Sequence, residues 1–295
     1  RERRQFHGVA EGDFDDMIRQ IEIVRDKIDR HPLLRLVLSA DDARAAQAEG
    51  KLGILLATQG ASMIGKELWR VSLFYRLGLR TIGLAYTPGN LFADGCGELR
   101  DAGLSFLGQE FVDAVNDLPM MLDLSHTGHR ARAEATARAL RPVCTHSNSY
   151  SVNPNDRNTR DETAKAIVDK GGVVGLCGLP ATVKPADPTL HDMMRHAEHY
   201  LGLLGPDGVG IGLDFTEAYQ ESGTIMDVSR RWRTLRPDIF GTVEDFNKQS
   251  YPRGLESIRF LPNFTQGMLD RGIPRDTATK VLGANWLACL ERMVG

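Results

Sequence analysis

The stretch MLDLSHTGHR, residues 121–130, decides how this chain folds. A mostly apolar run, 121–124, leads directly into Ser125 and His126. The stretch RPVCTHSN, residues 141–148, repeats the arrangement and finishes its run on His146. Short apolar runs of this kind are typical of strands buried on both faces of a parallel sheet. Two successive strands that each end on a histidine therefore indicate chemistry at one edge of that sheet.

Comparable apolar runs recur along the chain and alternate with segments of helical periodicity. Strands are expected at 33–39, 52–58, 80–86, 119–125, 141–146, 173–179 and 207–215. Helices are expected at 12–30, 40–50, 67–77, 104–118, 130–140, 160–172 and 190–205. This alternation favours an α/β fold, a (β/α)8 TIM barrel of the metal-dependent hydrolase type with one strand unrecognised or missing from the chain. A doubly wound open sheet is the alternative.

The length of 295 residues suits one α/β barrel or two smaller domains. No Gly/Ser-rich linker or change in composition divides the sequence, so we expect a single barrel domain over residues 1–295. The last part of the chain, 216–295, reads as loops and helices. Within it, residues 267–293 are expected to form a C-terminal helical hairpin.

Composition excludes several classes of function. The net charge is −3 and the basic residues are scattered, which argues against a nucleic-acid groove or a membrane-binding patch. The locally basic RRWRTLRP (230–237) reads as a solvated helix end. No apolar run approaches the roughly 18 residues of a membrane span, and no signal peptide is visible. Four widely spaced cysteines fit a reducing compartment, so we expect a cytoplasmic protein.

Polar residues stand where the predicted strands end. They are Gln59, Tyr86, His126, His146 and Asp214. Barrel enzymes carry their chemistry at the carboxyl ends of the strands, so these side chains are expected to meet at one rim. Imidazole and carboxylate groups are the usual zinc ligands, and a metal-bound water is a hydrolytic nucleophile. A metal site is one interpretation; ordinary loop or capped core histidines are the other.

Five blocks of sequence together resemble the membrane (renal) dipeptidase family of the amidohydrolase superfamily. They are MLDLSHTG, VCTHSNSYSVNPNDRNTRDE, KGGVVGL, HAEHYLGLLGPDGVGIGLDF and LPNFTQGMLDRGIPRDTATKVLGANWLACLERM. The resemblance runs from about Gly53 to the end, in order and spacing. It implies a (β/α)8 barrel, often a homodimer, that hydrolyses dipeptides or related amides with two zinc ions.

The resemblance also assigns roles to particular positions. His126 and His146 match two imidazole ligands of the second metal, and Asp214 matches the acid that orients and deprotonates the bridging water. Arg157 matches the arginine that binds the carboxylate of the substrate, a planar target that suits a guanidinium fork. Asn158 is expected to shape the turn that aims Arg157 and is grouped with it as a substrate-binding residue.

The sequence departs from the family pattern in three places. The bridging glutamate is replaced by Gln59, a poor bridge between two cations, which we count among the substrate-binding residues instead. The histidine expected after the next strand is replaced by Tyr86, whose hydroxyl can still donate a hydrogen bond to an oxyanion. The His-x-Asp pair of the first strand has no counterpart, because His7 and Asp13 lie too far apart. Either the pair lies upstream of Arg1 or this branch lacks it, and Gln59 favours loss of the first metal site.

Three functions follow from this reading. The favoured one is a dipeptidase-like hydrolase with one zinc ion, acting on a small amide or carboxylated substrate. The second is a metal-free barrel, either a small-molecule-binding protein or a lyase or isomerase with Tyr86 and Asp214 as acid and base. The third is a complete two-zinc dipeptidase whose first strand, with the His-x-Asp pair, is absent from residues 1–295. Two further histidines, His196 and His199, lie three apart on a predicted helix and are expected on its solvated face.

Overall fold

The computed structural model describes residues 12–215 and 227–295. Their contacts divide into two compact units. The N-terminal unit holds residues up to 143, together with 170–172 and 286–295. The C-terminal unit holds residues 144–169 and 173–285. The expectation of one domain over the whole chain stays a prediction.

The N-terminal unit is built on parallel strands that follow one another in chain order. They are β1 (Leu34–Leu36), β2 (Leu52–Ile54), β3 (Leu56–Thr58), β4 (Leu79–Gly83), β5 (Met121–Asp123) and β6 (Pro142–Val143). β1 pairs with β2, and β3 to β6 form a second sheet in that order. The predicted strand 52–58 is thus broken at Leu55, and the register shifts again between Leu56 and Ala57. The other predicted strands of this unit each overlap a shorter observed strand, and β4 begins one residue before its predicted range.

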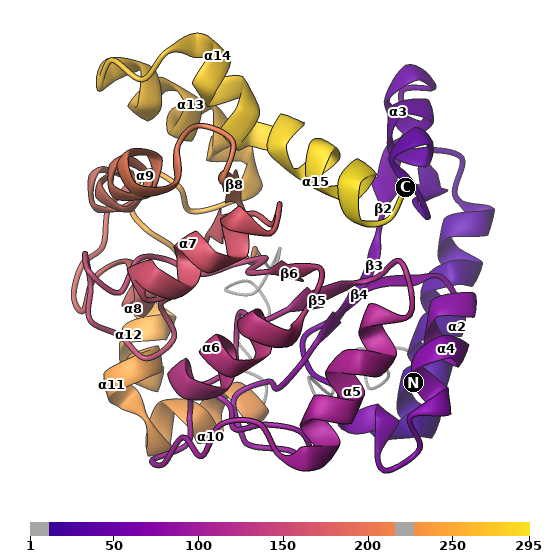
Figure 1. Cartoon of the computed structure of the whole chain (residues 1–295). Coiled ribbons are helices and arrows are strands. Elements are labelled where there is room, and N and C mark those ends of the chain that lie inside the picture. Colours follow the sequence, from indigo (N-terminus) through magenta and orange to yellow (C-terminus); the bar gives the residue numbers. More distant parts are fainter. Residues whose placement is uncertain (1–11, 216–226) are drawn as a thin grey trace. The chain divides into compact units, whose positions relative to one another are not determined.

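The helices of the N-terminal unit agree closely with the periodicity of the sequence. They are α2 (Phe14–Arg30), α3 (Ala40–Ala48), η1 (Ser62–Ile64), α4 (Trp69–Arg76), α5 (Phe106–Asn116), α6 (His129–Arg138) and nearly all of α15 (Asn285–Met293). Side chains cap several of them; Ser39 and Ser105 each accept a backbone N–H at the start of α3 and α5. Helices α4, α5 and α6 each precede the strand of the same number in the chain, and α5 contacts both α4 and α6 (Figure 1).

The C-terminal unit continues the same alternation. Its strands are β7 (Val174–Leu176) and β8 (Val209–Ile211), which pair in parallel. Cys144, the residue after β6, makes an isolated parallel bridge with Val174. The helices are α7 (Asp161–Asp169), α8 (Pro180–Val183), α9 (Leu190–Leu204), α10 (Asp227–Leu235), α11 (Pro237–Phe240), α12 (Val243–Lys248), η2 (Ile258–Phe260), α13 (Leu261–Asp270), α14 (Arg275–Thr279) and the π-turn η3 (Lys280–Ala284).

The expected C-terminal hairpin corresponds to α13 and α14, which are joined by a short turn and contact each other. Helix α14 continues through η3 into α15. Strands β4 to β7 are buried, as expected for strands covered on both faces; Ile82, Leu122, Val143 and Val174 are almost completely inaccessible to solvent. Strands β1 and β2 are partly exposed. Over residues 12–215 and 227–295 no helix is long and apolar enough to cross a membrane.

Candidate functional site

Four of the five predicted strand-end residues occupy the same position relative to their strands. Tyr86, His126, His146 and Asp214 each lie three residues beyond the last residue of β4, β5, β6 and β8, and Gln59 directly follows β3. Because the strands are parallel, these residues all leave their strands at the carboxyl end, where barrel enzymes carry their chemistry. Gln59, Tyr86 and His126 belong to the N-terminal unit, and His146, Arg157, Asn158 and Asp214 belong to the C-terminal unit.

The turn that carries His126 is held by a buried arginine. The Arg132 side chain comes from α6 and is only 1% exposed. Its Nε donates to the carbonyl of Leu124 at 3.0 Å, and its Nη2 donates to the carbonyls of Ser125 and Thr127 at 3.1 and 2.8 Å. A planar guanidinium can satisfy several acceptors in fixed directions, so Arg132 fixes the main chain on both sides of His126.

Tyr86 lies against the imidazole of His126. The ring centroids are 4.3 Å apart with an angle of 31° between the planes. The Nδ1 of His126 is 3.5 Å from the hydroxyl of Thr87. The structure thus brings together the histidine and the tyrosine that the sequence predicted at successive strand ends.

Gln59 is positioned by a close approach between β3 and β4. A Cβ atom on Gly83 would come within 2.2 Å of the carbonyl carbon and oxygen of Gln59. Only glycine fits there, so the main chain of Gln59 packs directly against β4. Its half-buried amide side chain is neutral, whereas the family pattern has a carboxylate at this position.

In the C-terminal unit, His146 is buried and 6% exposed. Its Nδ1 lies 2.7 Å from the hydroxyl of the preceding residue, Thr145. A Cβ atom on Gly212 would lie 1.7 Å from the carbonyl oxygen of Thr145, so the end of β8 can approach this segment only because residue 212 is glycine.

Asparagine side chains hold the segment that carries Arg157. Asn158 donates to the carbonyls of Asn153 and Thr182 at 2.9 and 2.8 Å, and Asn153 also donates to the carbonyl of Thr182 at 3.0 Å. The side-chain carbonyl of Asn155 accepts the backbone N–H of Arg157 at 2.9 Å. These amides are completely or almost completely buried and fasten the segment to α8. The expected role of Asn158 in shaping the turn agrees with these bonds, while its contact with substrate stays a prediction.

The charges of Arg157 and Asp214 both shift the pKa of one buried thiol, that of Cys177. Burial raises the pKa of Cys177, which directly follows β7, to about 11. The negative charge of Asp214 raises this pKa further, and the positive charge of Arg157 lowers it. Since such effects fade with distance, the carboxylate and the guanidinium lie near the same strand end. Asp214 is exposed and has a left-handed backbone with φ of 57°, a conformation that Asp and Asn adopt more easily than most residues.

A buried histidine that the sequence analysis assigned to a solvated face also supports this segment. His196 is completely buried, so that prediction was wrong. Its Nδ1 accepts the backbone N–H of Ser149 at 3.2 Å, and its Nε2 lies 2.9 Å from the carbonyl of Val183. Burial is the main reason that its pKa falls to about 4, so the imidazole is neutral at physiological pH. His199 is half-buried and lies 2.9 Å from the carboxylate of Asp161.

The donor chemistry of the two strand-end histidines fits a zinc ion. In both, Nδ1 lies close to a threonine hydroxyl, and an outer partner on one ring nitrogen orients the other toward a metal. Gln59 does not fit the role of a bridge between two ions. Within the described part of either unit, no group of three or more His, Cys, Asp and Glu side chains gathers as a complete metal site would require.

Comparison with known proteins identifies the family. A family model described as "Membrane dipeptidase (Peptidase family M19)" matches residues 6–235. The chain therefore belongs to the membrane dipeptidase family, as the sequence motifs predicted. This membership favours a hydrolase over the metal-free alternative.

Individual relatives agree with this assignment. Dipeptidase tcpJ of Claviceps purpurea is 25% identical over 96% of this chain and 63% of its own length. An uncharacterized dipeptidase of Schizosaccharomyces pombe is 33% identical over 73% of this chain and 54% of its own length. The chain thus spans less than two thirds of either curated relative.

A solved structure agrees with the fold. The amidohydrolase from Pseudomonas aeruginosa is 31% identical to this chain and superposes with a TM-score of 0.85, covering 96% of this chain and 86% of that one. The predicted (β/α)8 barrel class is confirmed.

Proposed function

We propose that this member of the membrane dipeptidase family hydrolyses a dipeptide, or a similarly small amide that carries a carboxylate, with water activated by one zinc ion. The observation that carries the proposal is the family match together with Asp214 at the end of β8 and Arg157 in the same unit, whose charges both affect Cys177. A guanidinium that can bind a carboxylate and an acid that can accept a proton lie near one strand end. That pairing suits a substrate whose scissile amide is close to its terminal carboxylate.

His126 and His146 are the residues that would hold the zinc ion, through the ring nitrogens opposite their threonine partners. When bound, zinc lowers the pKa of a coordinated water and polarises a carbonyl group. Gln59 supports one ion instead of two, because an amide oxygen cannot balance the charge of two cations as a bridging carboxylate does.

The remaining steps belong to side chains of this chain. Arg157 binds the substrate carboxylate through two parallel N–H donors, and the asparagine bonds to its segment keep that fork in place. Asp214 accepts a proton from the attacking water and returns it to the leaving amine nitrogen. The hydroxyl of Tyr86 donates a hydrogen bond to the oxygen on which negative charge develops.

The family resemblance also supports a homodimer that acts on a small molecule. The widely spaced cysteines and scattered basic residues support a cytoplasmic protein that binds neither a nucleic acid nor a membrane.

Zinc content and dipeptide hydrolysis test this function together. The purified full chain is expected to bind one zinc ion per chain and to hydrolyse a dipeptide such as alanyl-alanine, with activity lost on chelation and restored by zinc. A chain that binds no zinc and gains no activity when zinc is added excludes the proposal. Two ions per native chain would contradict the interpretation of Gln59.

The role of Arg157 is tested with a substrate pair. Arg157→Ala is expected to raise KM for the dipeptide by about 30-fold or more, since losing a partner of a charged pair costs on the order of 2–4 kcal/mol. The C-terminal amide of the same dipeptide, which lacks the carboxylate, should bind the native and variant enzymes alike. Arg160→Ala, an exposed arginine three residues away, is the matched control. An unchanged KM for every active substrate would remove Arg157 from the site.

A further inference from the structure

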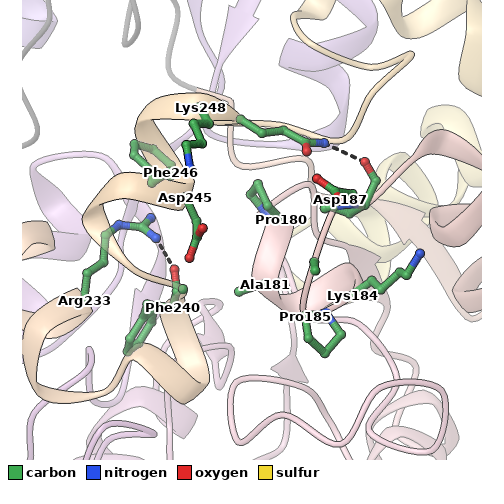
Figure 2. A pocket seen from close by; sticks show the side chains of 14 residues that line it. Pro180, Ala181, Lys184, Pro185, Asp187, Arg233, Phe240, Asp245, Phe246 and Lys248 are labelled. Atoms are coloured by element: carbon green, nitrogen blue, oxygen red, sulfur yellow. Dashed lines mark hydrogen bonds between the residues drawn. The ribbon is translucent and has the colours of Figure 1, made fainter.

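A separate cavity of about 410 Å³ lies within the C-terminal unit. One wall is α8 with the proline-rich segment that follows it, and the other is formed by α10, α11 and α12 (Figure 2). None of the lining residues is one of the predicted site residues discussed above. A volume of this size suits a small molecule.

Hydrogen bonds hold both walls of the cavity. Asn155 donates to the carbonyls of Ala181 and Ile239, at 3.1 and 2.9 Å, and so ties α8 to α11. Gln249, just after α12, donates to the carbonyl of Pro188 at 2.6 Å. Proline also fixes the backbone of the first wall at several positions. The cavity is therefore built into the fold, and a ligand would bind without ordering a loop.

Asp245 directs a carboxylate into this cavity (Figure 2). Its Oδ2 accepts the hydroxyl and backbone N–H of Thr242, at 2.6 and 3.3 Å, in the capping box of α12. These bonds fix the orientation of the carboxylate and are the main reason that the pKa of Asp245 is lowered. Asp245 is therefore a negatively charged acceptor at neutral pH.

The nearby Arg233 is engaged elsewhere. This residue is 6% exposed, its Nη1 donates to the carbonyl of Phe240, and its guanidinium lies 3.8 Å from the ring centroid of Phe246. The sequence analysis expected residues 230–237 to form a solvated helix end, and this prediction was wrong for Arg233. Arg233 therefore supports the wall, and its charge contributes least among the causes that lower the pKa of Asp245.

A flexible cation lies three residues from Asp245 on the same helix. Lys248 pairs with Glu244 at 2.7 Å, but both side chains are largely exposed, 68% and 77%. Exposed pairs of this kind contribute little, so the ammonium group can turn to a ligand at small cost. Lys184, on the other wall, extends away from the cavity in Figure 2 and pairs with Asp192 at 3.6 Å.

We propose that this cavity binds a free amino acid with an apolar side chain. Asp245 accepts hydrogen bonds from the α-ammonium group, and Lys248 binds the α-carboxylate. The apolar side chain packs against Phe240, Pro180 and Pro185, which line the space between the two walls. The proposal concerns a second ligand site and does not depend on the hydrolytic function.

Calorimetric titration of the full chain with three related probes tests the proposal. L-leucine carries both charges, isopentylamine lacks the carboxylate, and 4-methylpentanoate lacks the ammonium group. We expect saturable binding of leucine and at least about tenfold weaker binding of each singly charged probe, because a hydrogen bond to a charged group is worth roughly a factor of ten or more. Isopentylamine binding as tightly as leucine would overturn the assignment of Lys248.

Variants locate the bound probe. Asp245→Asn and Lys248→Gln are each expected to weaken leucine binding about tenfold or more. Asp192→Asn changes an acid with the same capping role in α9, outside the cavity, and Lys280→Gln removes an exposed lysine that pairs with Asp207; both should bind leucine normally. The absence of leucine binding, or leucine binding unchanged in the two cavity variants, would refute the proposal. Asp214→Asn should leave leucine binding intact while hydrolysis is lost, which separates this site from the proposed function.

Discussion

The two units differ in whether the charged side chains belong to the predicted site or to the groups that support it. In the N-terminal unit the predicted site residues Gln59, Tyr86 and His126 carry no permanent charge, and the group that supports the turn of His126, Arg132, is charged and buried. In the C-terminal unit the predicted site holds two charged residues, Arg157 and Asp214. The groups that support their segment are mainly neutral, namely buried amides and a neutral histidine, beside one charged pair between Asp156 and Arg236.

The difference indicates how a site can be kept rigid without disturbing its own electrostatics. A charged side chain beside Arg157 or Asp214 would compete with the substrate for them, whereas an amide supplies hydrogen bonds with no net charge. In the turn that carries His126, a guanidinium with several donors holds the main-chain carbonyls instead. We therefore expect the two units to respond differently when a charge is removed or added.

The largest expected effect follows from removing the charge of Asp214. Asp214→Asn should lower kcat on the order of 10³-fold, because the site loses its proton acceptor. Asparagine tolerates the left-handed backbone at this exposed position, so the free energy of unfolding should change by less than about 0.5 kcal/mol. Steady-state kinetics and urea denaturation check the two parts. A variant that retains a third of the native kcat would exclude Asp214 as the proton acceptor.

The next effect is on stability and comes from the N-terminal unit. Arg132→Met should lower the free energy of unfolding by about 3 kcal/mol, because buried main-chain carbonyls lose their donor. Zinc affinity should also fall, since the turn that carries His126 is less constrained. Arg138→Met, on the same helix, removes an exposed pair with Asp113 and an exposed hydrogen bond to the carbonyl of Gln109, and should cost less than about 1 kcal/mol. Equal losses in the two variants would mean that Arg132 does not support the turn.

The smallest expected effect comes from protonating His196, a neutral group that supports the site segment of the C-terminal unit. The pKa of His196 is about 4 in the folded protein and 6.5 in the reference state, so the unfolded chain binds the proton more readily. Stability should therefore be complete above pH 6.5 and decline as the pH falls toward 4, by about 2 kcal/mol at pH 5. Urea denaturation at pH 7 and pH 5 measures this loss. His196→Gln should be less stable at pH 7 but lose less between the two pH values; an unchanged pH dependence would assign the loss to other groups.

The sequence predicted the strands and most helices because burial on both faces leaves an uninterrupted apolar run. It could not predict the break at Leu55, which depends on how β2 and β3 pair with different neighbours. It also predicted the strand-end position of His126 and His146, because a polar residue after an apolar run is visible in one dimension. Their roles in binding a metal stay predictions.

The supports of the site were harder to predict. Arg132 looks like any helical arginine, and its acceptors are main-chain carbonyls that carry no sequence signal. His196 had a signal that was overlooked, because it shares a helix face with the buried Met193 and Tyr200 at spacings of three and four residues. Its partners, Ser149 and Val183, are distant in sequence, so the need for a neutral imidazole appears only in the folded chain.

The tight contact between Gly83 and the main chain of Gln59 has a consequence for directed evolution of this protein. Position 59 can be randomised freely, since its side chain is half-buried and only its backbone is confined. Residue 83 should not be varied at the same time, because any larger residue would push β3 away from β4. The variants at residue 59 would then no longer be compared on the same backbone. A library aimed at new metal content should therefore vary residue 59 alone, with Gln59→Glu as its first member, and treat glycine 83 as part of the scaffold.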